Sequence, residues 1–385
     1  MQIHANHKEI LEGKTTDIYF QRTEEILKRE KRNPEVTAEI WLKKLPEDYK
    51  WAIFTGLSEA IELFRNKKID IKGLPEGNLF FEKEPVLTIK GKYLDFAKFE
   101  TPLLGYICQA SGISTKTARC RITAGNKIVL SFGARRMHPC LTPVIDRYAY
   151  LGGADGVSAI LSAKKLNIEP KGTIPHAAIL IIGDTVKAAL AYDKTVKEGI
   201  PRIILVDTFG DEKVESIRLA KKLKNKLDAV RIDTPSSRRG NLKQIVRETR
   251  EELDNKGFNN VGIFVSGGLD EYSLEELNPF TRGYGIGTCI SDAPTINFSM
   301  DIVEIDGKPV TKKGQISGEK IILECSRCGE RKIVLKKEKK LSCICGNQMD
   351  VLTKSIIEKG QPVGEIETID VIRNRVLKEL RFLDV

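Results

Sequence analysis

The chain has 385 residues, of which 41% are hydrophobic and 30% charged, and this balance excludes an intrinsically disordered protein. At about 150 residues per domain, the length predicts two or three domains. Lys and Arg (63) exceed Asp and Glu (53), and the formal net charge of +10 suits an anionic substrate as well as a nucleic acid. Because the sequence shows neither a membrane-spanning apolar run nor a secretory signal, we expect a cytoplasmic protein with reduced cysteines.

The first part of the chain combines helical patterns with short strands. Apolar residues from Ile53 to Phe64 recur at spacings of four, four and three, which predicts one helix over residues 50–65. Residues 79–94 read as short strands broken by Pro85 and Gly91. A second long helical pattern follows from Glu100 to Arg119.

From about residue 127, buried strands alternate with helices. The predicted strands are residues 128–132, 203–206, 228–232, 261–265 and 284–287. Helices are expected to begin near Asp211 and Asn241, which are good capping residues. Such alternation indicates parallel βα units, and this many units favours a barrel or an open doubly wound sheet. In both architectures the site lies at the carboxyl ends of the strands.

After about residue 290 the chain returns to β-like segments, and it ends on a helical pattern from Ile366 to Leu383. Between them lie two close cysteine pairs, which are Cys325 with Cys328 and Cys343 with Cys345. Four thiolates at this spacing can bind Zn²⁺ tetrahedrally, as in a zinc ribbon or knuckle. Unligated thiols and redox chemistry are the alternatives. Four cysteine ligands leave no open position, so we expect a structural zinc ion and not a catalytic one.

Polar and glycine-rich loops follow several of the predicted strands. They are Ser131–Arg136, Thr173–His176, Arg231–Asp233, Ser266–Gly268 and Gly285–Thr288. Taken alone, residues 131–136 also fit a surface turn, His176 fits a structural histidine, and Arg231 with Asp233 fits an internal salt bridge. Each glycine loop is a weak signal by itself. Glycine, however, lets backbone N–H groups approach an oxyanion closely. Two glycine loops in adjacent units, together with Arg231 and Asp233, indicate a phosphorylated sugar ligand.

The order and spacing of these motifs resemble those of nicotinate phosphoribosyltransferases of the short archaeal and bacterial kind with a zinc knuckle. The matching segments are Thr16–Tyr19, Tyr49–Phe64, Glu100–Pro102, Ser131–Arg136, Gly152–Ser158, Gly172–Ala177, Val206–Thr208, Val230–Asp233, Val265–Glu271 and Gly283–Thr288. The resemblance implies an α/β fold in three parts. These are an N-terminal α/β domain at 1–115, the irregular TIM-like α/β barrel of type II phosphoribosyltransferases at 116–292, and a C-terminal region at 293–385 with the knuckle at about 320–350.

The resemblance also implies an activity. The family reaction displaces pyrophosphate from 5-phosphoribosyl 1-pyrophosphate (PRPP) with the ring nitrogen of nicotinate. It gives nicotinate mononucleotide, the entry step of NAD salvage from nicotinate. Mg²⁺ accompanies PRPP, and many members couple the reaction to ATP hydrolysis through a phosphohistidine. We therefore expect nicotinate, PRPP and Mg²⁺, with ATP as a possible co-substrate.

By the same resemblance, four residues are expected to bind the pyridine ring. Phe132 would form one face of the slot and Tyr19 of a neighbouring subunit the other, so the active sites would be shared in a dimer or larger homo-oligomer. Arg135 would bind the nicotinate carboxylate. Asp155 lies where related nicotinamide enzymes carry an Asp, and a carboxylate there would repel the acid unless it turns away or the arginines compensate.

The remaining expected site residues belong to PRPP and to ATP coupling. The residues expected to bind PRPP and its phosphates are Thr173, Gly267, Gly268, Gly287 and Thr288. Arg231 and Asp233 would contact the ribose and the pyrophosphate with its Mg²⁺, and they are assigned to catalysis. His176 matches the histidine that becomes phosphorylated, although its neighbours differ from those of many members.

Three alternatives remain open on sequence grounds. The same fold also serves nicotinamide and quinolinate phosphoribosyltransferases, and the second usually has a shorter chain without a knuckle. A remoter alternative is a nucleic-acid-binding zinc protein, because lysines 336, 337, 339 and 340 lie beside the cysteine pairs. That lysine run lacks the interleaved aromatic residues of a base-stacking surface, so we do not expect a nucleic acid as partner. We do not expect a membrane either, because the apolar runs are too short to cross a bilayer.

Overall fold

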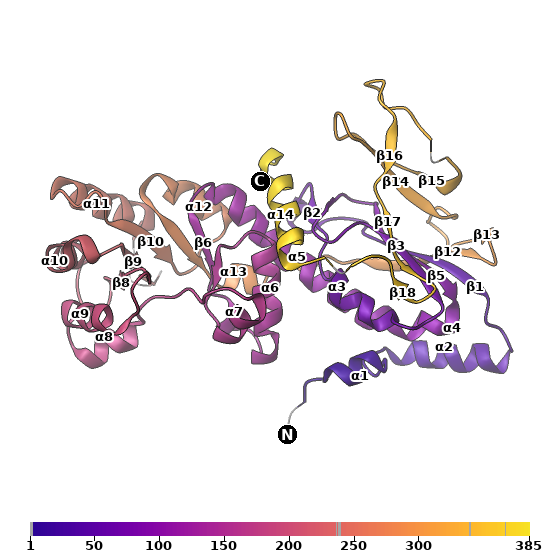
Figure 1. The fold of residues 1–385 in the computed structure, drawn as a ribbon, viewed down its shortest axis with the longest axis horizontal. Helices are drawn as coiled ribbons and strands as arrows, with labels where there is room; N and C mark the ends of the chain where they lie inside the picture. The colour runs from indigo at the N-terminus through magenta and orange to yellow at the C-terminus, as the bar shows by residue number, and fades with distance from the viewer. Residues whose placement is uncertain (1–2, 236, 238–239, 339, 366) are drawn as a thin grey trace. The chain divides into compact units, whose positions relative to one another are not determined.

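The computed structural model describes residues 3–385 except 236, 238–239, 339 and 366, and it divides into two compact units (Figure 1). The first unit combines the segment up to Thr115 with Pro294–Glu379, and the second combines Lys116–Ala293 with Leu380–Val385. The C-terminal region that the sequence sets apart at 293–385 therefore joins the N-terminal segment for most of its length. The reason is strand pairing, because the late strands β12 (Ser299–Ile305) and β17 (Lys354–Glu358) complete the sheet that the early strands begin.

Within the described residues, the first unit is built on a seven-stranded sheet in the order β13-β12-β1-β5-β3-β17-β18. The strands are β1 (Glu35–Trp41), β3 (Ile69–Gly73), β5 (Pro85–Lys92), β12 (Ser299–Ile305), β13 (Lys308–Pro309), β17 (Lys354–Glu358) and β18 (Gln361–Pro362). Its helices are α1 (His7–Leu11), α2 (Ile18–Arg29), α3 (Leu57–Ala60), α4 (Tyr93–Phe96), the first part of α5 (Glu100–Ala124) and α14 (Ile369–Glu379). Alternate residues of β1, such as Val36, Ala38 and Ile40, enter the hydrophobic core of this unit.

The helix predicted over residues 50–65 is wrong in its first half. Ala52–Ile53 form strand β2, which pairs with β4 (Leu79–Phe80), and α3 begins only at Leu57. Gly56, at the start of α3, has φ +94°, a left-handed conformation that breaks a helix but suits glycine. The apolar residues of the pattern are still buried, since the short helix and the 3₁₀ turn after it keep one face inward.

Strand β5 runs through Gly91 although that glycine was expected to end it. A Cβ at Gly91 would lie 2.6 Å from Cγ2 of Ile69, so the glycine permits close pairing with β3. A separate three-stranded sheet, in the order β15-β14-β16, contains β14 (Lys320–Cys325), β15 (Arg331–Leu335) and β16 (Met349–Val351). The β14–β15 hairpin places Cys325 and Cys328 at one end of this sheet.

The second unit contains six parallel strands in the order β7-β6-β11-β10-β9-β8. They are β6 (Ile128–Ser131), β7 (Gly156–Val157), β8 (Ile203–Leu205), β9 (Ala229–Ile232), β10 (Gly262–Ser266) and β11 (Gly283–Ile286). The helices are α6 (Thr142–Leu151), α7 (Ile160–Leu166), α8 (His176–Ile182), α9 (Thr185–Thr195), α10 (Glu212–Leu223), α11 (Leu242–Asn255), α12 (Glu271–Leu277) and α13 (Thr288–Ser291). The predicted α/β class is confirmed, and so are the five predicted strands, to within two residues at each end.

The sequence predicts an irregular barrel, but the described strands pair as an open sheet, because β7 and β8 have one neighbour each. Side-chain caps start the helices where the sequence indicates. Asp211 accepts hydrogen bonds from the N–H groups of Lys213 and Val214, and Asn241 accepts one from Gln244. None of the described helices is long and apolar enough to cross a membrane.

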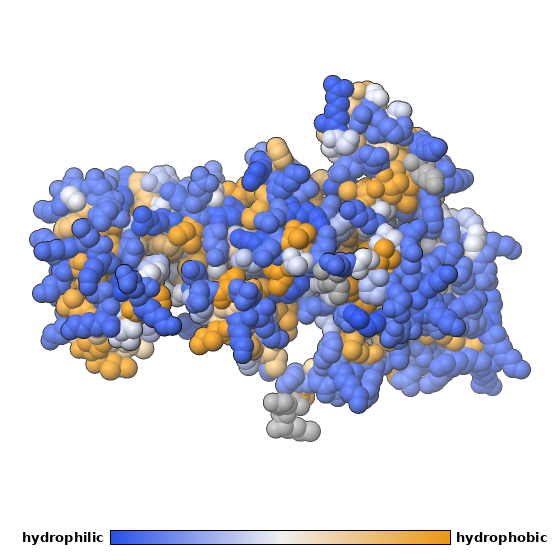
Figure 2. All heavy atoms as spheres, in the orientation of Figure 1, coloured by the Kyte–Doolittle hydropathy of each residue, from blue (hydrophilic) through white to orange (hydrophobic). Residues whose placement is uncertain are grey.

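Hydrophilic side chains cover most of the visible surface, but an apolar patch lies over α8 (Figure 2). In α8, Leu180 is 56% exposed, Ile181 is 86% exposed and Ile182 is 42% exposed. Clustered exposed aliphatic side chains are typical of interaction surfaces.

The two glycines inside α5 predict opposite effects of the same substitution. A Cβ at Gly112 would lie 2.4 Å from the carbonyl oxygen of Pro294, so Gly112→Ala should destabilise the chain by about 1–3 kcal/mol through overpacking. Gly105 has no atom within 4 Å of such a Cβ, so Gly105→Ala should stabilise α5 by up to about 1 kcal/mol. Thermal unfolding of the two variants beside the wild type measures both shifts. Equal shifts in one direction would contradict this packing of α5.

Candidate active site

The carboxyl ends of neighbouring parallel strands surround a cavity of about 120 Å³ in the second unit. Its lining comes from the segments that follow β6, β9, β10 and β11. The lining residues are Phe132, Arg135, Arg136, Arg231, Asp233, Ser266, Gly267, Gly268, Gly285, Gly287 and Thr288. Loops that are widely separated in the sequence therefore converge on one small polar hollow, at the edge of the sheet where parallel α/β folds bind ligands.

Phe132 supplies the flat apolar surface of this cavity. Its backbone N–H donates to the carbonyl of Ile286, 2.8 Å away, which continues the pairing of β6 with β11. A Cβ at Gly285 would lie only 2.2 Å from Cε2 of the Phe132 ring, so the ring packs directly over the glycine. The guanidinium carbon of Arg231 is 5.7 Å from the ring centroid, within the range of a cation–π contact.

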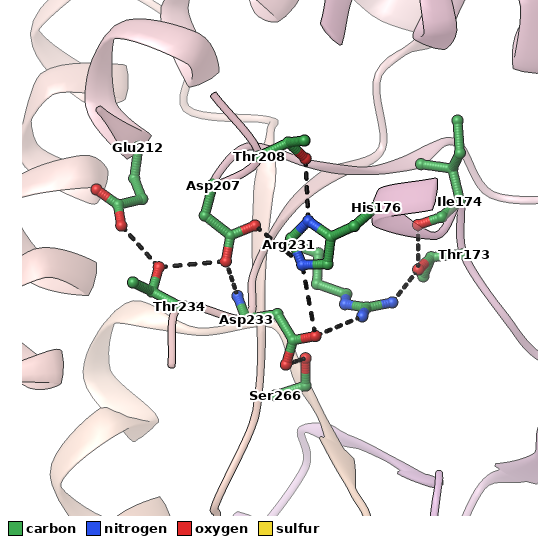
Figure 3. A network of polar contacts seen from close by, with 10 residues as sticks. All are labelled: Thr173, Ile174, His176, Asp207, Thr208, Glu212, Arg231, Asp233, Thr234 and Ser266. Carbon is green, nitrogen blue, oxygen red and sulfur yellow. Dashed lines mark hydrogen bonds and ion pairs between the residues drawn. The ribbon is translucent and has the colours of Figure 1, made fainter. Parts of the chain in front are cut away.

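Arg231 and Asp233 form the charged part of the cavity (Figure 3). They are two residues apart, so both side chains lie on one side of the chain as it leaves β9. Nη2 of Arg231 donates to Oδ2 of Asp233 at 2.9 Å, and Nη1 donates to Oγ1 of Thr173. The other oxygen of Asp233 accepts a hydrogen bond from Ser266 at 2.8 Å. Three loops are thereby linked through one ion pair.

His176, the first residue of α8, lies beside this ion pair (Figure 3). Its Nδ1 is 3.0 Å from Oγ1 of Thr208. Its Nε2 is 3.7 Å from Oδ1 of Asp207 and 3.9 Å from Oδ2 of Asp233. The ring is 38% exposed and thus accessible, with one nitrogen directed at two carboxylates.

Asp207 is the functional candidate that the sequence analysis left without a role. Its side chain is 1% exposed, and burial raises the pKa of this carboxyl. Oδ2 accepts from the N–H of Asp233 at 2.7 Å and from Oγ1 of Thr234 at 3.2 Å, while Oδ1 has no hydrogen-bond partner. Thr234 in turn donates to Glu212 at 2.6 Å. The position of Asp207 directly after the predicted strand at 203–206 was the signal that could have identified it.

The two glycine loops have backbone conformations and contacts that side chains would disturb. Gly267 and Gly268 have φ values of +90° and +69°, in the left-handed region. A Cβ at Gly267 would also lie 2.9 Å from Oδ1 of Asp233. At the second loop, a Cβ at Gly133 would lie 2.8 Å from the carbonyl oxygen of Gly287. Glycine therefore allows these loops to approach one another and the cavity.

Arg135 and Arg136 occupy a 3₁₀ turn, Ala134–Arg136, that follows Phe132 and Gly133. Both are exposed, and both line the cavity. Their side chains place two cations beside the aromatic ring without burying either of them.

Two of the predicted residues, Tyr19 and Asp155, make other contacts within their own units. Tyr19 lies on α2 in the first unit, where its ring is 55% exposed and 4.4 Å from the ring centroid of Phe20. Asp155 lies at the amino end of β6, opposite to the cavity. Its carboxylate pairs with Arg121 at 2.7 Å and accepts from the N–H of Val129 at 2.8 Å. These contacts hold Asp155 away from the substrate position expected for it.

The four clustered cysteines lie together in the first unit. The Sγ atoms of Cys325 and Cys345 are 3.5 Å apart, those of Cys328 and Cys343 are 3.4 Å apart, and all four lie within 4.8 Å of one another. Tetrahedral ligands at a Zn–S distance of about 2.3 Å are separated by about 3.8 Å, so the set fits one zinc ion.

Of the lysines that follow β15, Lys336 forms an ion pair within the protein. Lys336 pairs with Glu319 at 2.6 Å, and Lys339 lies outside the described residues.

Two family models match consecutive parts of the chain. The N-terminal domain of quinolinate phosphoribosyl transferase matches residues 17–111, and its C-terminal domain matches residues 113–301. The chain belongs to the quinolinate phosphoribosyltransferase family. The predicted α/β fold of the type II phosphoribosyltransferases and the enzyme class are thereby confirmed.

Individual relatives agree with this membership. A curated nicotinate phosphoribosyltransferase of Mycobacterium tuberculosis is 27% identical, over 91% of this chain and 86% of its own. The crystal structure titled nicotinate-nucleotide pyrophosphorylase from Pyrococcus furiosus has a TM-score of 0.97 and 43% identity, over 100% of this chain and 99% of that chain. Human nicotinic acid phosphoribosyltransferase shares the fold, with a TM-score of 0.75 and 20% identity over 95% of this chain and 93% of that chain. The resemblance to nicotinate phosphoribosyltransferase seen in the sequence is confirmed by these relatives.

The contact between Gly285 and Phe132 yields a prediction for stability. Gly285→Ala should destabilise the chain by about 1–3 kcal/mol, because the new methyl group overlaps the ring. In a Phe132→Ala background the same substitution should cost much less, since the ring is gone. Thermal unfolding of the two single variants and the double variant measures this coupling. Strictly additive losses would show that the ring does not pack on Gly285.

Proposed function

We propose that this protein is a nicotinate phosphoribosyltransferase, which transfers the phosphoribosyl group of PRPP to the ring nitrogen of nicotinate and releases pyrophosphate. The observation that carries the proposal is the cavity in which Phe132 and Arg135 meet the Arg231–Asp233 pair and two glycine loops. An aromatic ring and a nearby arginine suit a flat aromatic acid, and glycine loops suit a phosphate. The names of the curated relatives support the same assignment.

Nicotinate is bound by Phe132 and Arg135. Stacking of the pyridine ring on an aromatic side chain contributes about 0.5–1.5 kcal/mol beyond burial. The guanidinium of Arg135 pairs with the carboxylate in a two-pronged geometry, which orients the ring as well as attracting it. Arg136 adds a second cation at the same side of the cavity. Asp155 is omitted from the substrate site because Arg121 holds it at the other end of the sheet.

PRPP lies across the glycine loops and the charged pair. Backbone N–H groups around Gly267, Gly268, Gly287 and Thr288 bind the 5-phosphate. Thr173 and Arg231 contact the ribose and the leaving pyrophosphate. Asp233 and Asp207 are the carboxylates that would hold Mg²⁺, which would offset the negative charge that grows on pyrophosphate. The protein's contribution is alignment and charge stabilisation, since the nicotinate nitrogen carries no proton to remove.

His176 is assigned to ATP coupling. Its imidazole is accessible, and Thr208 fixes the ring through Nδ1, which leaves Nε2 directed at Asp207 and Asp233. A phosphoryl group transferred from ATP to Nε2 would lie close to the carboxylates of Asp207 and Asp233. Because all three groups carry negative charge, a cation is needed between the phosphoryl group and the carboxylates. Phosphorylation of His176 is therefore expected only when ATP is supplied together with Mg²⁺.

Product formation from three acceptors tests the proposal. The purified chain should form mononucleotide from PRPP and nicotinate faster than from nicotinamide or quinolinate, each assayed with and without ATP. A phosphate label that appears on the wild type but not on His176→Ala would support ATP coupling. Preference for nicotinamide would refute the substrate assignment.

Quinolinate is the second candidate, because it names the matching family models. Its two carboxylates would need both Arg135 and Arg136. Release of CO₂ with mononucleotide formation from quinolinate would identify this activity in the same assay.

Arg135 should control the use of nicotinate. Arg135→Ala removes the charge-assisted pair that holds and orients the nicotinate carboxylate, so turnover of nicotinate should fall by about a hundredfold or more. Arg135→Lys should recover only part of this loss, because an ammonium lacks the planar fork. Titration calorimetry should find PRPP binding nearly unchanged in both variants. Loss of PRPP binding instead would assign Arg135 to the phosphate.

The second face of the pyridine slot is assigned to Tyr19 of the partner subunit. Tyr19 is largely exposed on α2, and the apolar patch on α8 supports assembly of this chain into a homo-oligomer. Inactive Tyr19→Ala and Phe132→Ala proteins, mixed and allowed to exchange subunits, should regain activity. In a mixed dimer, one of the two sites keeps both aromatic residues. No recovery after demonstrated exchange would place both rings in one chain's own site.

A structural zinc ion is proposed for Cys325, Cys328, Cys343 and Cys345. It would stabilise the β14–β16 sheet without taking part in the reaction. Metal analysis of protein purified without added zinc should give about one equivalent per chain. Cys343→Ser should lower the unfolding temperature and leave turnover intact in the folded fraction. A metal-free protein of unchanged stability would contradict the assignment.

A further inference from the structure

A buried charged cluster lies where the helices that follow the two glycine loops meet α5. Glu271, the first residue of α12, has a side chain with 0% exposure. Its Oε1 accepts from Nζ of Lys116 at 2.9 Å and from Nε of Arg119 at 3.0 Å. Both cations come from the last part of α5 and are themselves buried, at 10% and 6% exposure. The first glycine loop ends at Gly268, three residues before Glu271.

The second glycine loop reaches the same cluster. Cys289 directly follows Thr288, and its Sγ is 4.0 Å from Oε2 of Glu271. The Sγ of Cys120, on α5, lies within 4.8 Å of Cys289 Sγ and of the nearest carboxylate oxygen of Glu271. Glu271 therefore contacts residues of α5 and of α13, and it joins the ends of both loops to one rigid helix.

A metal ion is not the best explanation of this cluster. Oε1 of Glu271 is already shared by two cations, which would repel a third. The hydrogen bond with Cys289, together with burial, also holds the pKa of Cys120 well above its usual range, whereas a metal needs the thiolate.

We infer that Glu271 is a positioning residue that holds both glycine loops in the geometry that binds the 5-phosphate of PRPP. Gly267 and Gly268 lie at positive φ between β10 and α12, so the place of their N–H groups depends on how the start of α12 is held as well as on β10. A buried carboxylate cannot leave its two cations without a large desolvation penalty. The cluster therefore fixes the loops before the ligand arrives, and phosphate binding need not order them. This inference rests on the proposed function.

Asp193 offers a matched control within the same unit. Its carboxylate also holds one arginine and one lysine, at 3.0 Å from Nε of Arg202 and 2.8 Å from Nζ of Lys226. It is 11% exposed. Arg202 directly precedes β8, so this cluster lies at the amino end of the sheet, opposite to the cavity. Asp193→Asn removes the same kind of charge without touching either loop.

The experiment compares PRPP binding by titration calorimetry, in the presence of Mg²⁺, for the wild type, Glu271→Gln and Asp193→Asn. Glu271→Gln should bind PRPP at least about tenfold more weakly, while Asp193→Asn should bind like the wild type. Both variants should unfold at a lower temperature than the wild type. A loss of PRPP affinity that occurs only in Glu271→Gln therefore cannot result from lower stability alone. With PRPP saturating, the KM for nicotinate of Glu271→Gln should stay close to that of the wild type.

Wild-type affinity in Glu271→Gln would overturn the inference and leave the proposed function standing. Failure of the wild type itself to bind PRPP would overturn the proposed function and the inference with it. If Glu271→Gln does not fold, Lys116→Gln replaces it, because Glu271 then keeps Arg119. Lys116→Gln should weaken PRPP binding by a smaller factor, and unchanged affinity there would again overturn the inference.

Discussion

The site depends on the parallel pairing of β6, β11, β10 and β9. Parallel neighbours end at the same edge, so the residues that follow each strand become neighbours without any contact between them along the chain. Phe132, Arg231, Ser266 and Gly287 meet for this reason alone. The Arg231–Asp233 ion pair then links the loops laterally, through Thr173 on one side and Ser266 on the other.

Close packing of backbone against side chain sets the shape of the cavity. The Phe132 ring lies on Gly285, and the loop at Gly133 contacts the carbonyl of Gly287. A Cβ at Gly285 would collide with the Phe132 ring, and a Cβ at Gly133 would collide with the carbonyl oxygen of Gly287. Only glycine leaves room for these neighbouring groups. Behind the loops, the buried Glu271 carboxylate with Lys116 and Arg119 supplies the rigidity that glycine lacks. The site thus combines a permissive backbone at the surface with fixed charges beneath it.

Much of this arrangement could be predicted from local patterns. Buried strands at 203–206 and 261–265, and caps at Asp211 and Asn241, follow from hydrophobic runs and from side chains that bind free N–H groups. The convergence of the strand-end loops follows from parallel topology. These features are local, or they follow from a rule that applies to every parallel sheet.

What could not be predicted depends on contacts between distant segments. Residues 52–53, which were expected to be helical, form strand β2 because they pair with residues 79–80. The C-terminal strands join the first unit because β12 pairs with β1 along its whole length. Asp155 forms an ion pair with Arg121, and Glu271 forms ion pairs with Lys116 and Arg119. The partners in these pairs are far apart in the sequence, so no local pattern predicts them. The two-residue strand β7 is too short to give a pattern.

A crystal structure of the protein with PRPP and Mg²⁺ tests the central claim most directly. The claim is that the strand-end cavity of the second unit binds the phosphoribosyl donor. The 5-phosphate should lie within hydrogen-bonding distance of backbone N–H groups in both loops, Gly267–Gly268 and Gly287–Thr288. The pyrophosphate should face Arg231 and Asp233, and C1 of the ribose should point toward Phe132. A 5-phosphate bound at Arg135 and Arg136, with both glycine loops empty, would contradict this assignment of the site.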